Sequence, residues 1–318
     1  MPLATAWDVA GRARRSWAHA YRAPVPVICV GNLVAGGAGK TPVVLALAIR
    51  LRTAGVAAQI VTRGYGGRLN GPVRVDPARH DAAAVGDEPL LLAKETAVWV
   101  ARDRAAGARA AAAAGAGAIL LDDGFQNPAL AKSLSLIVVD AAYGFGNGRV
   151  IPAGPLRESL ARGLKRADAV ILLAADPAAR RPAALPLPGD LPIVPARLAA
   201  IDQARWAGER LVAFAGIGRP EKFFAMLRAA GAEVVGARAF PDHHPFRTGE
   251  IAALRRDATR LGARLVTTRK DFVRLPAAER AGIAVLDIAI GWPDPAALTR
   301  LLAPILPPPS PPPLAGEG

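Results

Sequence analysis

A glycine-rich loop between an apolar run and an amphipathic helix constrains the fold of this chain most strongly. The segment reads VPVICVGNLVAGGAGKT and continues into PVVLALAIRLRTAG. Gly36, Gly37 and Gly39 permit a tight turn whose backbone N–H groups point at phosphate oxygens. Lys40 places a positive charge near the β and γ phosphates, and Thr41 offers a hydroxyl to Mg²⁺. The pattern predicts a phosphate-binding loop between a buried strand and the N-terminus of a helix.

Two positions of this loop depart from the common patterns. Val34 stands where the usual spacing has a glycine, and Ala35 stands where a large class of deviant loops often carries a lysine. Glycine-rich turns between a strand and a helix also occur in α/β proteins that bind no nucleotide. Three glycines followed by Lys-Thr nevertheless favour nucleotide binding. We expect ATP contacts from Asn32, Val34, Ala35, Gly36, Gly37, Ala38, Gly39, Lys40 and Thr41.

The composition favours an anionic partner and a reducing compartment. The formal net charge is +14, from 40 Lys and Arg against 26 Asp and Glu. That excess suits an anionic lipid surface, a phosphorylated substrate or nucleic acid, although an Ala/Arg-rich bias explains part of it. The basic residues are scattered and aromatic residues make up only 5%, so nucleic acid ranks last. Cys29 is the single cysteine, which excludes a disulfide framework, and no apolar run reaches membrane-spanning length.

The order of apolar runs and helical stretches predicts an α/β fold with two parts. Residues 24–175 are expected to form a P-loop NTPase-like parallel sheet with helices on both faces. A proline-rich linker is expected over residues 176–192, and the α/β pattern restarts over 193–303 as a second, smaller lobe. The proline-rich residues 304–318 are predicted to be a disordered tail.

The N-terminal residues 1–23 are predicted to form an amphipathic helix. Trp7, Trp17 and Tyr21 fall on one arc at helical spacing, and arginines flank that arc. An aromatic face bordered by arginines suits a membrane interface. A helix that packs on its own domain fits the same pattern equally well.

Two acids follow the predicted strand AGAILLDD. Asp122 and Asp123 would lie at the carboxyl end of a buried strand downstream of the phosphate-binding loop. This is a Walker B arrangement, in which one carboxylate holds Mg²⁺ and the second polarises a ligand. The same pair could instead only cap a turn.

Several other polar residues are expected at the carboxyl edge of the sheet, where parallel α/β proteins bind ligands. Arg63 can meet a phosphate, and Tyr65 can stack on a ligand. Asp87 and Glu88 open a helical stretch; they either cap it or act as a proton acceptor and a metal ligand. Arg104 begins another helix as an anion ligand or as a surface charge.

Three later segments carry further candidates. Arg157 follows the rigid PAGPL loop and can lie near the phosphates. Asp242, His243 and His244 are adjacent in an extended segment, so the two imidazoles alternate sides and joint metal binding is disfavoured. One histidine paired with a carboxylate for acid–base chemistry fits better. The segment TTRKD closes another strand at a ligand edge.

Taken together, these segments resemble the tetraacyldisaccharide 4'-kinase family over residues 5–290. The resemblance rests on ordered motifs: GNLVAGGAGKTP, TRGYGG, VGDEPLLLA, LDDGFQN, IPAGPLRE, FPDHHPF and TTRKD. It implies transfer of the ATP γ-phosphate to the 4'-hydroxyl of an acylated glucosamine disaccharide 1-phosphate, in lipid A biosynthesis. It also implies Mg²⁺ dependence and peripheral work at the cytoplasmic face of the bacterial inner membrane, with no nucleic acid and no obligate protein partner.

The resemblance also implies roles for individual residues. The catalytic group it implies consists of Asp87 as base, His243 as its assistant, Lys40, Asp122 and Asp123. The implied Mg²⁺ ligands are Thr41, Glu88, Asp122 and Asp123. Nucleotide contacts beyond the loop fall to Arg63, Tyr65, Arg157 and Glu158, and substrate contacts to Arg104 and Asp87.

A regulatory or partitioning ATPase with a deviant P-loop is the alternative. Such proteins use ATP as a conformational switch and usually dimerise through a signature lysine. Ala35 occupies that position here, which argues against this alternative.

Overall fold

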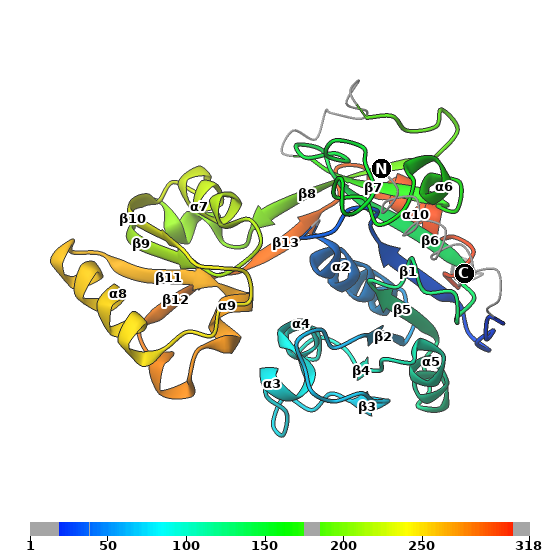
Figure 1. Ribbon diagram of the computed structural model, residues 1–318, viewed down its shortest axis with the longest axis horizontal. Helices are drawn as coiled ribbons and strands as arrows, with labels where there is room; N and C mark the ends of the chain where they lie inside the picture. The colour runs from blue at the N-terminus through cyan, green and yellow to red at the C-terminus, as the bar shows by residue number, and fades with distance from the viewer. Residues whose placement is uncertain (1–18, 38, 175–184, 308–318) are drawn as a thin grey trace, which may run out of the picture.

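Two α/β lobes joined by a two-stranded ribbon make up the computed structural model, which describes residues 19–37, 39–174 and 185–307 (Figure 1). The ribbon consists of β8 (Ile193–Ala200) and β13 (Ile288–Gly291), which pair antiparallel. Among the described residues, no helix combines the length and apolar character that crossing a bilayer requires. The two α/β lobes agree with the predicted fold class.

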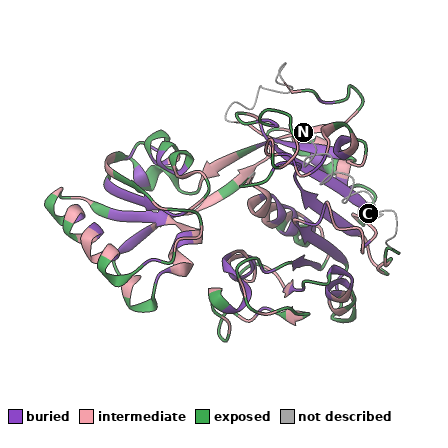
Figure 2. Ribbon diagram, in the orientation of Figure 1, coloured by how far each residue is buried: buried purple, intermediate pink, exposed green. Residues whose placement is uncertain are grey.

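The large lobe is built on a nine-stranded sheet in the order β13-β8-β7-β6-β1-β5-β2-β4-β3. The strands from β8 to β4 run parallel, and β3 and β13 are antiparallel edges. Both faces of the central strands are buried (Figure 2), which explains why these segments read as continuous apolar runs. The remaining strands are β1 (Val27–Gly31), β2 (Ala58–Thr62), β3 (Val73–Arg74), β4 (Val98–Val100), β5 (Ala118–Asp122), β6 (Leu134–Asp140) and β7 (Ala169–Leu173).

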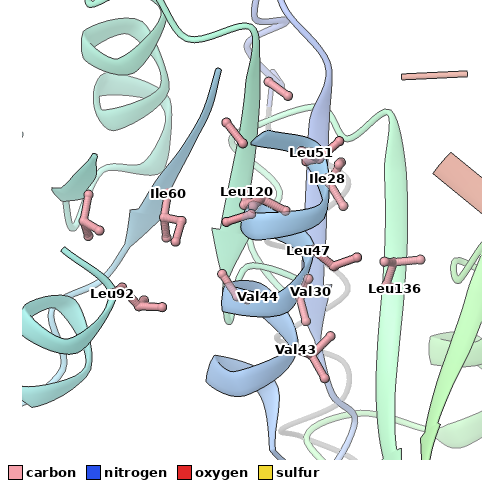
Figure 3. Close-up of a cluster of buried hydrophobic side chains, with 14 of the residues drawn as sticks. Ile28, Val30, Val43, Val44, Leu47, Leu51, Ile60, Leu92, Leu120 and Leu136 are labelled. Atoms are coloured by element: carbon pink, nitrogen blue, oxygen red, sulfur yellow. The ribbon is translucent and has the colours of Figure 1, made fainter. Parts of the chain in front are cut away.

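Helices cover both faces of this sheet. On one face α2 (Lys40–Thr53) packs Val43, Val44, Leu47 and Leu51 against the strands (Figure 3), and α10 (Pro295–Leu302) joins the same core. On the other face lie α5 (Arg104–Ala113) and α6 (Leu160–Leu164). Two short helices, α3 (Ala82–Val85) and α4 (Asp87–Leu92), follow β3.

The small lobe has a four-stranded parallel sheet in the order β10-β9-β11-β12. One apolar cluster buries the phenylalanines of α7 (Pro220–Ala229), and a second buries Ile251 and Leu254 of α8 (Thr248–Arg260). The helix α9 (Arg269–Arg274) follows β11 directly. The strands are β9 (Arg210–Ala215), β10 (Glu233–Ala239), β11 (Arg264–Thr268) and β12 (Ile283–Leu286); short 3₁₀ turns span Gln203–Trp206 and Ala277–Glu279.

The chain is divided between the lobes differently from the sequence-based division at residue 193. β8 pairs with β7, and α10 packs in the large lobe, so the small sheet is confined to strands within residues 210–286. The apolar run IAVLDIAI is not one strand: Asp287 separates β12 from β13, which belong to different sheets. Residues 1–18, 175–184 and 308–318 lie outside the described residues, and with them most of the predicted N-terminal helix, linker and tail.

The packing of α2 predicts a stability difference between two of its residues. Leu47 is fully buried, whereas Ile49 is 39% exposed on the same helix. Leu47→Ala should lower the free energy of unfolding of the large lobe by about 2–5 kcal/mol, because it leaves a cavity in the core. Ile49→Ala should cost well under about 1 kcal/mol. Urea unfolding followed by circular dichroism compares the two, and equal losses would contradict this packing.

Candidate active site

The phosphate-binding loop joins the carboxyl end of β1 to the start of α2. Gly39 precedes the helix with a φ of 82°, and a Cβ there would lie 2.5 Å from the Leu173 side chain, so glycine is required. The Asn32 side-chain amide donates to the Gly36 carbonyl at 3.5 Å, and the Ala35 N–H donates to the Pro155 carbonyl at 2.7 Å. The loop is thereby held on both sides, while Ala38 lies outside the described residues.

Asp122 lies beside this loop because β5 pairs with β1, with Val30 opposite Asp122. Thr41 Oγ1 donates to Asp122 Oδ2 at 3.4 Å, while Oδ1 is buried and has no hydrogen-bond partner among the described residues. Burial, followed by the nearby charges of Glu88 and Asp123, raises the pKa of Asp122 to about 7. A buried carboxylate oxygen without a donor, next to a threonine hydroxyl, fits a Mg²⁺ ion, which prefers oxygen ligands.

Asp123 is the neighbouring carboxylate, but its environment is different. Arg157 donates to both of its oxygens, at 2.8 and 3.0 Å, and Lys40 Nζ lies 3.7 Å from Oδ2. Burial raises the pKa of Asp123, but Lys40 and Arg157 outweigh burial and hold that pKa below its ordinary value. Asp123 is therefore a charged anchor for the loop lysine, whereas Asp122 keeps an oxygen available for a ligand.

Glu158 belongs to a hydrogen-bond network next to the loop. The Glu158 side chain is almost fully buried, and Arg166 Nη2 donates to its Oε1 at 2.5 Å. Gln126 Nε2 lies 3.3 Å from the same oxygen and also donates to the Asn32 carbonyl at 3.0 Å. This network ties the loop to the segment that carries Arg157. Gln126 was not among the predicted site residues, because a polar side chain after the two acids carries no signal of its own.

A second cluster forms where the two lobes meet, around Asp87 at the start of α4. Its Oδ2 accepts from Arg274 Nε at 2.6 Å and forms an ion pair with Arg274 Nη2, and His243 Nδ1 lies 3.2 Å away. Among the described residues, the hydrogen bond from Arg274 Nε and the short contacts of His243 Nδ1 and Arg274 Nη2 are all made by Oδ2. The structure therefore brings together Asp87 and His243, two predicted residues that are far apart in the sequence (α4 faces α9 in Figure 1).

Glu88 and Tyr65 border the same cluster. Glu88 Oε1 pairs with Lys270 Nζ at 2.9 Å, and its charge also acts on Asp122, so it lies between the two clusters. The Tyr65 ring, 66% exposed, meets the edge of the His243 ring at a centroid distance of 5.4 Å. His244 lies apart from this cluster, and its Nε2 is 2.9 Å from Glu250 Oε2.

Two further predicted arginines of the large lobe, Arg63 and Arg104, differ in exposure. Arg63 is exposed, while Arg104 is buried and donates to the Ala101 carbonyl at 2.6 Å. Burial lowers the pKa of Arg104, and nearby Asp122 and Asp123 act in the opposite direction. Arg104 thus contributes a buried positive charge beside the two acids.

Arg274 and a third inter-lobe contact were not predicted, and Lys270 was placed at a ligand edge within TTRKD but without a role of its own. Arg274 is nearly buried and also donates to the Gly216 carbonyl at 2.7 Å, which fixes it in the small lobe. Asp140, at the end of β6, accepts from Arg219 at 2.6 Å and pairs with Lys222. In a chain with 40 Lys and Arg, no local pattern distinguishes these basic residues from surface charges.

The raised pKa of Asp122 predicts a pH-dependent stability. Because its pKa is about 7 in the folded protein against an ordinary 3.8, the folded state binds the proton more tightly, and stability falls as pH rises between these values. Asp122→Asn should therefore raise the melting temperature at pH 8 in EDTA by a few degrees, and little at pH 4. Mg²⁺ should stabilise the original protein at pH 8 but not the variant.

Scanning calorimetry measures both effects. Asp103→Asn, which changes an exposed cap residue of the same lobe, is the matched control and should leave the pH dependence unaltered. A lower melting temperature for Asp122→Asn at pH 8 without metal would contradict the assigned environment of this carboxylate.

Comparisons with known proteins show the family of this chain. The family model described as tetraacyldisaccharide-1-P 4'-kinase matches residues 2–306. A tetraacyldisaccharide 4'-kinase from Rhodospirillum centenum is 60% identical and covers 96% of this chain and 90% of its own length. One from Dinoroseobacter shibae is 54% identical, covering 96% and 92%.

A solved structure is similar over the whole chain. This crystal structure of the "apo" form of LpxK from Aquifex aeolicus, in complex with ATP, superposes with a TM-score of 0.76 at 26% identity. It covers 96% of this chain and 98% of its own. With a full-length family match, close relatives and a shared two-lobed fold, the chain belongs to the tetraacyldisaccharide 4'-kinase family.

Proposed function

We propose that this protein transfers the γ-phosphate of ATP to the 4'-hydroxyl of a tetraacyldisaccharide 1-phosphate, a step of lipid A biosynthesis. The observation that carries the proposal is the position of Asp87. Arg274 and His243 contact its Oδ2, and it belongs to the cluster that Glu88 links to the phosphate-binding loop. A carboxylate placed beside a phosphate site is what transfer to a sugar hydroxyl requires.

The nucleotide would bind at the loop between Asn32 and Thr41. Its backbone N–H groups and Lys40 would hold the phosphates, and Arg157, fixed on Asp123, would lie beside them. Thr41 and Asp122 would hold Mg²⁺, with Glu88 close enough to assist. The ion would neutralise charge on the transferred phosphoryl group. Arg63 and Tyr65 would contribute from the rim, and Arg104 would add positive charge for the anionic reactants.

Asp87 would act as the general base. The acceptor hydroxyl loses its proton to Asp87 Oδ1 as its oxygen forms a bond to the γ-phosphorus, and the bond from that phosphorus to ADP breaks. His243 and Arg274 hold Oδ2, so the carboxylate is oriented with its other oxygen towards the acceptor. A switch ATPase would have no use for a carboxylate oriented in this way.

The substrate's acyl chains place the reaction at a lipid surface. A net charge of +14 supports peripheral binding to anionic lipid, and we infer that the protein works at the cytoplasmic face of the bacterial inner membrane. The predicted N-terminal helix would contribute aromatic contacts there. No nucleic acid and no obligate protein partner enter this scheme.

Label transfer tests the reaction. With γ-labelled ATP, Mg²⁺ and the tetraacyldisaccharide 1-phosphate, label should appear in the lipid fraction. Asp87→Asn should lower kcat by about 10²–10⁴-fold with little change in ATP affinity, because it removes the base but not the nucleotide site. Asp81→Asn, an exposed cap on the preceding short helix, is the matched control. Release of label only as free phosphate would refute the kinase assignment.

Sedimentation with vesicles tests the membrane proposal. The protein should pellet with vesicles that contain phosphatidylglycerol at low salt, and much less with pure phosphatidylcholine, because the attraction is electrostatic. Raising the salt to about 0.5 M should release it, since the Debye length then falls well below 10 Å. Equal binding to both vesicle types would argue against an electrostatic surface contact.

A further inference from the structure

The His243 ring lies among four charged side chains that require opposite positions for its proton. Asp87 Oδ2 is 3.2 Å from Nδ1, and Lys270 Nζ is 3.2 Å from Nε2. Arg274 Nη2 is 3.3 Å from Nδ1, and Asp242 Oδ1 is 3.8 Å from Nε2. A neutral imidazole has one donor nitrogen and one acceptor nitrogen. It can therefore satisfy either a first set of partners, Asp87 and Lys270, or a second set, Arg274 and Asp242, but not both.

The first set is satisfied when the proton is on Nδ1. A carboxylate only accepts and an ammonium only donates, so Asp87 requires a proton on Nδ1 and Lys270 requires a lone pair on Nε2. The second set would need the reverse tautomer. It is the weaker set, because 3.8 Å between Asp242 and Nε2 is too long for a hydrogen bond. Arg274 Nη2 is within hydrogen-bond distance of Nδ1, but it is also in an ion pair with Asp87, to which Arg274 Nε donates.

We propose that Lys270 is a positioning residue that fixes His243 in the Nδ1–H tautomer, so that His243 donates to Asp87. This role deepens the proposed kinase function and rests on it for its catalytic meaning. Lys270 suits the task because its ammonium also pairs with Glu88 at 2.9 Å, next to Asp87 on α4. The ammonium is therefore held between the lobes, with one donor directed at the imidazole.

The consequence for Asp87 follows from its contacts. With Nδ1–H, its Oδ2 accepts from His243 and from Arg274 Nε and also faces the Arg274 Nη2 charge, and Oδ1 is left for the hydroxyl proton. Without Lys270, Nε2 can take the proton, and Nδ1 then accepts from Arg274 Nη2. That change would remove one donor from Asp87 and draw part of the Arg274 contact away from it.

Imidazole ¹⁵N NMR reads the tautomer directly. The chain has only 4 histidines, and His243→Gln identifies the relevant signals. At about pH 9, well above an ordinary imidazole pKa, the original protein should show a protonated Nδ1 and an unprotonated Nε2 for His243. Lys270→Met should shift both signals towards the opposite tautomer. Lys270→Arg, which also only donates, should restore the original pattern.

Two variants separate this role from a simple contact between the lobes. Glu88→Gln removes the ion pair but keeps the Lys270 donor, so it should leave the His243 tautomer unchanged. Lys94→Met, on the exposed surface of the same lobe as Glu88, should change nothing. A protonated Nε2 in the original protein, or unchanged signals in Lys270→Met, would overturn the proposal.

Kinetics add a second readout. Lys270→Met should lower kcat about tenfold or more without raising the KM for ATP, and Lys270→Arg should recover most of the loss. A raised KM for both substrates without recovery by arginine would indicate a lost inter-lobe contact and would overturn the positioning role. The NMR result stands without any lipid acceptor, so a failed kinase assay and a failed tautomer assignment are distinguishable.

Discussion

The parallel pairing of β1 with β5 is the contact on which the rest of the site depends. Both strands are fully buried, and their register sets Val30 opposite Asp122. The two strands therefore end at the same level, and the loop after β1 meets the acids after β5. A shift of one residue would turn Asp122 to the other face of the sheet and remove it from Thr41. A hydrophobic register thus decides where the charged chemistry lies.

The two adjacent acids differ because of what surrounds them. Asp123 is neutralised by Arg157 and Lys40, whereas Asp122 is buried with one oxygen lacking a donor among the described residues. The same division occurs at the lobe interface, where Arg274 and His243 use one oxygen of Asp87 and leave the other. In both cases the protein contacts one oxygen of a carboxylate and leaves the other for a ligand. Of Asp87, Asp122 and Asp123, Asp87 is the one that contacts residues of the small lobe.

The sequence was sufficient to predict those features that depend on neighbouring residues in the chain. The loop glycines, Lys40, Thr41 and the two acids were identified from their spacing beside apolar runs, and most central strands were found by the same runs. The division of the chain between the lobes could not be predicted in this way, because β12 and β13 read as one apolar run although they belong to different sheets. Arg274 was missed because its contact with Asp87 spans 187 residues of the chain. Lys270 was placed at a ligand edge within TTRKD, but its contacts with His243 and Glu88 depend on how the lobes pack.

By itself, the sequence determined that the chain forms an α/β fold with a phosphate-binding loop and a pair of acids at a strand end, because backbone freedom, burial and charge act over a few residues. Only the tertiary structure decided the strand order, the lobe to which β8 and α10 belong, and which oxygen of Asp122 has no donor among the described residues. Those features depend on which distant segments pack together. The position of a single donor, such as Arg274 beside Asp87, is fixed by that packing and not by its sequence neighbours.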